Sequence, residues 1–570
     1  MAMIERFLEL EVLLSPEVYE FLKNYNKIVD LINKIKEFKK YNKRFILLDK
    51  KFLDIFLTES LEDIIENYKD FDFIKYYTGE EDKKEEKIEK EKKINEEEII
   101  KKIEELNKVD KDKKIEDKNK YLEDRKRRFS YISKIKESVN SRINWIAKDI
   151  EEKIEIYEDS DVTGKSTCTG TIEDFIEYFK DRYERLKKFI IKKANRKPID
   201  LDKINKYKGY DDIFVVGIVS EVSYTKTGHL RVKIEDTKDE ATLLIPKEKI
   251  DNKDIPDDIL LDEVIGAIGK VSNNNMIIVD KIIRPSITPK PPKKINEQIY
   301  MMFLSDIHIG SKEFLHREFE KLIKLLNGDV NDCLEEKVVS RLKYICIAGD
   351  LVDGVGVYPG QEEDLYEIDI LSQYEEIALY LEQIPEHISI IISPGNHDAV
   401  RPAEPQPRLP DDIIKLFNRD NMYFVGNPCC LNIHGFDTLL YHGRSFDDLV
   451  SQIKTASYEN PATIMRELIK RRLLCPTYGG RCPIAPEHKD YLVIDRDIDI
   501  LHTGHIHING YDIYRGVVLV NSGTFQEQTD FQKRMGISPT PAIVPIIDLS
   551  KVGDIGHYLE WDRGILEVRY

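Results

Sequence analysis

The sequence has few cysteines, no long apolar run and no signature of export. Its seven cysteines among 570 residues are an odd number and too few for a disulfide framework. A reducing cytoplasm is therefore the expected location. No uninterrupted apolar run reaches about 18 residues, which argues against a membrane span. The first ten residues, MAMIERFLEL, place acids inside their apolar stretch, so we expect no secretory signal.

Basic residues are outnumbered by acidic ones. Lys and Arg number 88 against 106 Asp and Glu, which gives a net charge of −18. A chain this acidic is not expected to hold polyanions through its overall field. Nucleic acid would have to bind at a local patch, through cations or through a partner. Charged residues make up 34%, above the usual ~25%, so some segments must be nearly all charge.

The amino-terminal third divides into three segments. Residues 1–72 show apolar positions at helical spacing and predict a helical module. Residues 73–129 predict a charged flexible linker, because only Ile88 is uncharged between Glu80 and Lys93. A single solvated helix with Glu–Lys pairs is the alternative. Residues 130–205 predict a helical connecting segment.

One phosphate-binding motif can be excluded in the connecting segment. Gly164, Lys165 and Ser166 resemble the end of a P-loop. That loop needs a glycine five residues earlier, where the chain has Asp159, and no apolar strand precedes it.

Residues 206–285 alternate apolar and polar side chains. Five short strands predict a small closed barrel of the oligonucleotide-binding (OB) type, although a small sandwich gives the same pattern. The expected strands are Ile213–Val219, His229–Ile234, Thr242–Ile245, Val264–Val271 and Met276–Ile283. OB barrels often bind single strands on aromatic side chains, and these strands carry few. A packing module and a DNA-binding module both remain open.

The rest of the chain predicts an α/β domain. A proline-rich connector at 286–295 precedes alternating apolar strands and helical stretches over 296–570, the pattern of a buried sheet flanked by helices. The expected fold class is thus multidomain, with a helical module, an OB-type barrel and an α/β domain.

Five apolar strands of this last domain each end in a polar cluster. The clusters are Asp306 with His308, Asp350 with Asp353, Asn396-His397-Asp398, His442, and His505 with His507. Residues two apart on an extended strand point to one side, and strand carboxyl ends meet at the crevice of an open α/β sheet. Each cluster alone has an ordinary structural explanation. Together, mixed oxygen and imidazole donors indicate a site for Mn²⁺, Fe²⁺ or Zn²⁺.

The order of these clusters resembles the calcineurin-like metallophosphoesterases. The resemblance implies a two-sheet α/β sandwich that holds two divalent metal ions and hydrolyses phosphoesters. It implies that Asp306, His308 and His507 hold one ion, and that Asn396, His442 and His505 hold the other. Asp350 would bridge the two ions. His397 would face the scissile phosphate as a proton donor, and Asp398 would steady His397.

A narrower resemblance covers roughly residues 210–570. A barrel directly before a phosphoesterase domain, with the segments 394–407, 441–445 and 474–486, is similar to the small-subunit family of archaeal family D DNA polymerases. This resemblance implies a 3′→5′ proofreading exonuclease and a large catalytic subunit as heterodimer partner. The implied substrate is DNA with single-stranded or mismatched 3′ ends. The implied cofactor is Mn²⁺, with Fe²⁺, Zn²⁺ or Mg²⁺ as alternatives.

Two other functions stay open on the sequence alone. One is a non-catalytic scaffold subunit, against which the complete ligand set counts. The other is a stand-alone metallophosphatase, against which the barrel and the long extension count. Cys475 and Cys482 lack two further ligands for zinc, so they are expected to be structural thiols or a disulfide.

Overall fold

The structure is a computed structural model. It describes residues 12–14, 28–39, 46–48, 53, 55–57, 64, 121–272, 276–554 and 558–569. The chain divides into two compact units, Met1–Asn119 and Lys120–Tyr570. No helix among the described residues is long and apolar enough to cross a membrane.

The first unit contains strands as well as a helix. Strands β1 (Val12–Leu14) and β2 (Ile46–Leu48) pair in parallel, and helix α3 (Ile28–Phe38) buries Phe38 against Phe56 with ring centroids 5.3 Å apart. The purely helical module predicted for residues 1–72 is therefore not confirmed. Most of the predicted linker, residues 73–120, lies outside the described residues.

The end of the charged segment is a docked helix. Residues 121–132 are helical. Arg128 Nε lies 2.8 Å from Glu376 Oε2, and Arg125 Nη2 lies 2.6 Å from Glu375 Oε2. Ile132 is fully buried in the core of the second unit. A flexible linker was expected to run to residue 129, but ion pairs to helix α12 (Ile370–Glu382) hold its last residues in place.

The connecting segment, residues 130–205, supplies a strand as well as a helix. Strand β3 (Ile154–Ile156) pairs antiparallel with β13 (Cys429–Ile433). Helix α8 (Ile172–Ala194) starts with a capping box between Thr171 and Asp174. Part of the stretch that was expected to be helical therefore belongs to a sheet of the α/β domain.

The predicted barrel is confirmed. Five strands close in the order β4-β5-β6-β8-β7 around an apolar interior. They are β4 (Ile213–Tyr224), β5 (Leu230–Glu235), β6 (Glu240–Ile245), β7 (Val264–Val271) and β8 (Met276–Ile283), with helix α9 (Lys247–Asp251) between β6 and β7. The alternating pattern fixes which side chains fill the interior, so the strand positions follow the sequence closely.

Two sheets build the α/β domain. The seven-stranded sheet runs β12 (Met422–Phe424), β11 (Ser389–Ser393), β10 (Leu342–Ala348), β9 (Tyr300–Leu304), β18 (Ile543–Asp548), β19 (Tyr558–Asp562), β20 (Ile565–Arg569). The six-stranded sheet runs β16 (Gly510–Tyr514), β17 (Val517–Asn521), β15 (Ile500–Thr503), β14 (Phe436–Leu440), β13, β3. Strands β9, β10 and β11 are parallel to one another, as are β14 and β15.

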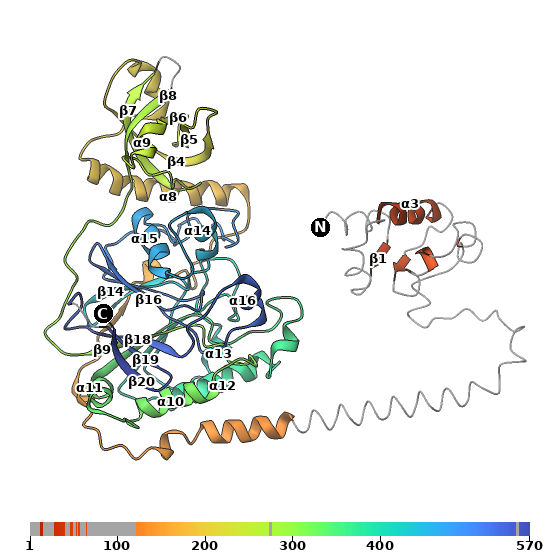
Figure 1. The fold of residues 1–570 in the computed structure, drawn as a ribbon, viewed down its shortest axis with the longest axis vertical. Coiled ribbons are helices and arrows are strands. Elements are labelled where there is room, and N and C mark those ends of the chain that lie inside the picture. The colour runs from red at the N-terminus through yellow and green to blue at the C-terminus, as the bar shows by residue number, and fades with distance from the viewer. Residues whose placement is uncertain are drawn as a thin grey trace, which may run out of the picture. The chain divides into compact units, whose positions relative to one another are not determined.

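The two sheets face each other across a shared apolar core. Met301 and Phe303 of β9 point into that core, whereas Met302 and Leu304 point to the outer face. Helices α10 (His316–Leu326), α11 (Cys333–Arg341) and α12 cover the seven-stranded sheet. Helices α14 (Phe446–Gln452) and α15 (Pro461–Arg471) cover the six-stranded sheet (Figure 1). Two further short helices of the α/β domain are α13 (Asp411–Ile414) and α16 (Asp530–Met535). This layering brings strand ends from both sheets to one edge.

Candidate metal centre

All five polar clusters begin two or three residues past the end of a strand. Asp306 follows β9, Asp350 follows β10 and Asn396 follows β11, all in the seven-stranded sheet. His442 follows β14 and His505 follows β15 in the six-stranded sheet. The site is therefore built from both layers of the domain.

The first group joins the two sheets. Nε2 of His308 lies 3.1 Å from Nε2 of His507, and Asp306 Oδ1 lies 3.5 Å from the same His507 nitrogen. One ligand atom from each residue lies within 4.8 Å of the others. All three side chains are buried, with Asp306 fully inaccessible.

The second group centres on His442. Its Nε2 lies 3.2 Å from Asp350 Oδ2 and 3.1 Å from Asn396 Oδ1. Asp350 Oδ2 also lies 3.9 Å from Nε2 of His308, so this carboxylate stands between the two groups. Asp306, Asp350 and His442 can offer ligand atoms within 4.8 Å of one another.

His505 lies beside the second group but has a partner of its own. Its ring centroid is 5.2 Å from that of His442, and its Nε2 lies 3.3 Å from Asp447 Oδ2. Tyr458 donates its hydroxyl hydrogen to Asp447 Oδ1 at 2.7 Å. This chain of contacts occupies Nε2, so Nδ1 is the nitrogen of His505 that can serve a metal ion.

His397 and Asp398 have separate surroundings. Nδ1 of His397 lies 2.7 Å from the main-chain oxygen of Asp353, and its side chain lines the cleft. Asp398 instead accepts hydrogen bonds from the Gly395 amide at 2.9 Å and from the Tyr374 hydroxyl at 2.9 Å. Asp398 thus holds the loop that carries His397.

The backbone at the site is strained. Five of the seven expected ligands have left-handed backbone: Asp306 (φ 50°), His308 (φ 55°), Asp350 (φ 53°), His505 (φ 72°) and His507 (φ 59°). Such a conformation costs about 1–3 kcal/mol for a non-glycine residue and gathers at functional sites. Gly349 and Gly395 let the backbones approach closely, because a Cβ on Gly395 would lie 2.2 Å from Asp350 Oδ1.

Asp350 and His442 are both buried and hold each other charged. Burial opposes the charge of Asp350, but His442 and His397 outweigh it and hold the pKa of this carboxyl well below its usual range. Burial opposes the charge of His442 too, yet Asp350 raises the pKa of His442 to about 10. Burial raises the pKa of Asp398, which stands near the negative Asp350, to about 6. A divalent cation would compete with the imidazole protons for the same atoms.

Sequence reasoning placed Asp353 in a strand-end cluster without a role and missed Asp447 and Gln532, yet all three support the expected ligands. Asp353 Oδ1 lies 2.9 Å from Nδ1 of His308, and Gln532 Nε2 lies 2.8 Å from Nδ1 of His507. Asp447 supports His505. Only Asp353 had a signal, its fixed spacing from Asp350. Asp447 and Gln532 come from helices α14 and α16, whose placement depends on tertiary packing.

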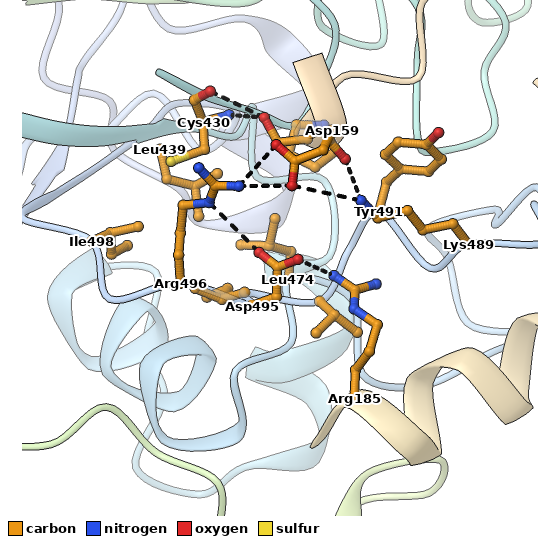
Figure 2. A pocket seen from close by; sticks show the side chains of 14 residues that line it. Asp159, Arg185, Cys430, Leu439, Leu474, Lys489, Tyr491, Asp495, Arg496 and Ile498 are labelled. Carbon is orange, nitrogen blue, oxygen red and sulfur yellow. Dashed lines mark hydrogen bonds and ion pairs between the residues drawn. The ribbon is translucent and has the colours of Figure 1, made fainter. Parts of the chain in front are cut away.

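The site opens into the larger of two described cavities. A cleft of about 620 Å³ is lined by His308, Asp350, His397, His505 and His507, among others. The smaller cavity has about 20 Å³, which is room for roughly one water molecule. Figure 2 shows ion pairs across it, where Asp159 binds Arg496 and Asp495 binds Arg185. Of these two cavities, the cleft is the one large enough for part of a nucleic acid or another phosphoester.

The chain resembles known proteins over this region and beyond it. The model of the calcineurin-like phosphoesterase family matches residues 299–509, which include all five clusters. A DNA polymerase II small subunit of Methanocaldococcus jannaschii is 75% identical over the whole of both chains. That of Archaeoglobus fulgidus is 45% identical over 68% of this chain and 77% of its own. That of Methanothermobacter thermautotrophicus is 40% identical over 68% and 80%.

Proposed function

The chain belongs to the family of DNA polymerase II small subunits, and on that premise we propose that it carries a two-metal 3′→5′ exonuclease. The observation that carries the proposal is the pair of ligand groups that share one cleft. The name of its relatives further supports a large catalytic subunit as partner and DNA as substrate.

The residues fit two divalent cations. Imidazole nitrogens with carboxylate and amide oxygens suit Mn²⁺, and also Fe²⁺ or Zn²⁺. Asp306, His308 and His507 would hold one ion, and Asn396, His442 and His505 the other, with Asp350 between them. Two such ions supply charge stabilisation for a phosphodiester and a nucleophile derived from water. Asp353, Asp447 and Gln532 keep three of the imidazoles in place.

His397 supplies proton transfer at the leaving oxygen. The main-chain oxygen of Asp353 accepts the hydrogen on Nδ1, which fixes the tautomer and leaves Nε2 to exchange a proton. Asp398 and Tyr374 hold the loop rigid beneath it. General acid catalysis of this kind contributes about 10²–10⁴-fold in rate.

The test uses the whole chain with Mn²⁺ and single-stranded DNA labelled at its 5′ end. Successive shortening from the 3′ end supports the exonuclease. Hydrolysis of nitrophenyl phosphate without DNA cleavage would instead indicate a phosphatase. A chain that binds the large subunit and two ions but cuts neither substrate, alone or in the complex, would indicate a scaffold.

A further inference from the structure

Two aromatic side chains line the cleft beside the metal centre, and the proposed chemistry uses neither. Phe531 lies on helix α16 and is 64% exposed, and Tyr358 lies in the loop after β10 and is 39% exposed. Single exposed aromatics are common on protein surfaces. These two differ because they line the same cavity as His397 and the expected ligands His308, Asp350, His505 and His507.

Hydrogen bonds tie both aromatic segments to the metal centre. Phe531 precedes Gln532, whose amide contacts His507, and a capping box with Thr529 fixes the start of the helix. On the other segment, the Val357 amide donates to Gln361 Oε1 at 2.8 Å, and Gln361 Nε2 donates to Asp353 Oδ2 at 2.9 Å. The backbone segments that carry the two rings are therefore held in place relative to the ligands.

Charge in the cleft does not favour a long polyanion. The basic residues that line it are Lys312 and Arg534, and the acidic ones outside the ligand groups include Glu313, Asp364, Asp447 and Asp530. The whole chain carries −18. A strand that enters this cleft must gain much of its affinity from something other than side-chain cations.

We propose that Phe531 and Tyr358 stack on the bases of the unpaired nucleotides at a 3′ end and so place the last phosphodiester over the metal centre. This inference rests on the proposed function and names the part of the substrate that is bound. Every base has a flat face, so stacking tolerates any sequence. Bases inside a duplex already stack on one another, so a frayed or single-stranded end fits better than a paired one.

The experiment is a double-mutant cycle. It removes an aromatic side chain from the protein and a base from the DNA strand, separately and together. Fluorescence anisotropy measures binding of the full chain to a labelled single strand of about ten nucleotides in calcium buffer. A matched strand carries abasic sites at its last 3′ nucleotides. Phe531→Ala should weaken binding of the normal strand about 5- to 150-fold, the range expected for one stacked base. The same change should alter binding of the abasic strand by less than about twofold.

Three comparisons keep the test specific. Phe531→Trp should retain binding, because the larger ring still stacks. Tyr358→Ala should repeat the base-dependent loss, whereas Tyr131→Ala, at an aromatic that is 54% exposed and does not line the cleft, should not. Metal content by mass spectrometry should stay unchanged in every variant.

An equal loss on both strands, no loss on either, or loss of metal from Phe531→Ala would each overturn the inference. Cleavage is scored separately in Mn²⁺. Base-dependent binding without any release of nucleotides would refute the exonuclease and leave the stacking site standing. Cleavage by the wild-type chain without base-dependent binding would refute the stacking site alone.

Discussion

The barrel and the metal centre of this chain follow opposite rules. The interior of the barrel is an apolar cluster, and charged residues such as Arg231 and Glu221 pair at its surface, at 2.6 Å with both about half exposed. The metal centre buries carboxylates and imidazoles on left-handed backbone.

The difference distinguishes residues that stabilise the fold, as in the barrel, from residues that do not, as in the metal centre. Local pattern, core and strand positions agree in the barrel, as expected where stability alone decides. The strand-end residues of the metal centre instead lower stability through strain and burial of charge. Such a cost is typical of residues at functional sites.

The largest effect should come from Asp350→Asn. The change removes a buried negative charge that faces His442 and His308. Metal affinity should fall more than about 100-fold, beyond the effect of residues that only support a ligand, and cleavage should fall to background. Mass spectrometry and the labelled-strand assay measure the two together. If metal binding and DNA cleavage are both unchanged, Asp350 is not a metal ligand. The contrast between the metal centre and the barrel would then not hold.

His397→Ala should remove catalysis without removing metal. A lost proton donor lowers the rate by about 10²–10⁴-fold while DNA and both ions still bind. Its neighbour is the matched comparison, since Asn396→Ala removes an amide oxygen 3.1 Å from His442 Nε2 and should weaken one ion. Added Mn²⁺ should then restore DNA cleavage by Asn396→Ala in part. Rescue of His397→Ala by metal instead would show that the two roles are reversed.

Asp447→Ala should weaken one of the two ions about 10- to 100-fold, because His505 loses the carboxylate that orients its ring. Asp447→Asn should lose less metal affinity, since an amide oxygen can still accept the hydrogen bond from Nε2–H of His505. Metal titration followed by mass spectrometry gives both affinities. Asp530→Asn is the control, an exposed carboxylate in the same cleft. Equal effects of Asp447→Ala and Asp530→Asn would mean that general charge, and no specific contact, matters.

Leu243→Ala should have the smallest effect on the centre. Leu243 is fully buried in the barrel, and its truncation should cost about 2–5 kcal/mol of stability. Urea unfolding measures that cost, and metal titration should show an unchanged affinity in the folded protein. A loss of metal affinity in the folded Leu243→Ala variant would show that the barrel and the metal centre are energetically coupled.

Much of this architecture could be predicted from the sequence. The barrel strands were predictable because one buried face enforces strict alternation. The strand-end residues were predictable because parallel strands bring their carboxyl ends to one edge. In both regions the decisive information is local in the chain.

What escaped prediction depends on distant contacts. Strand β3 has three residues in a charged stretch, and only its pairing with β13 makes it a strand. Half of residues 121–132 are charged. Arg128 in this segment is ordered by Glu376, which lies 248 positions away. Asp447 and Gln532 reach the centre only after helices α14 and α16 have packed.

The two-sheet origin of the ligands has a consequence for how the domain comes apart. The first ligand set combines Asp306 and His308 from one sheet with His507 from the other, and the second combines Asn396 with His442 and His505. Each ion would then bind ligands from both sheets and link them. Because a ligand that binds only the folded state stabilises it in proportion to the logarithm of its concentration, chelation should let the layers part at lower temperature. The metal ions proposed for catalysis would therefore also hold the two sheets of the domain together.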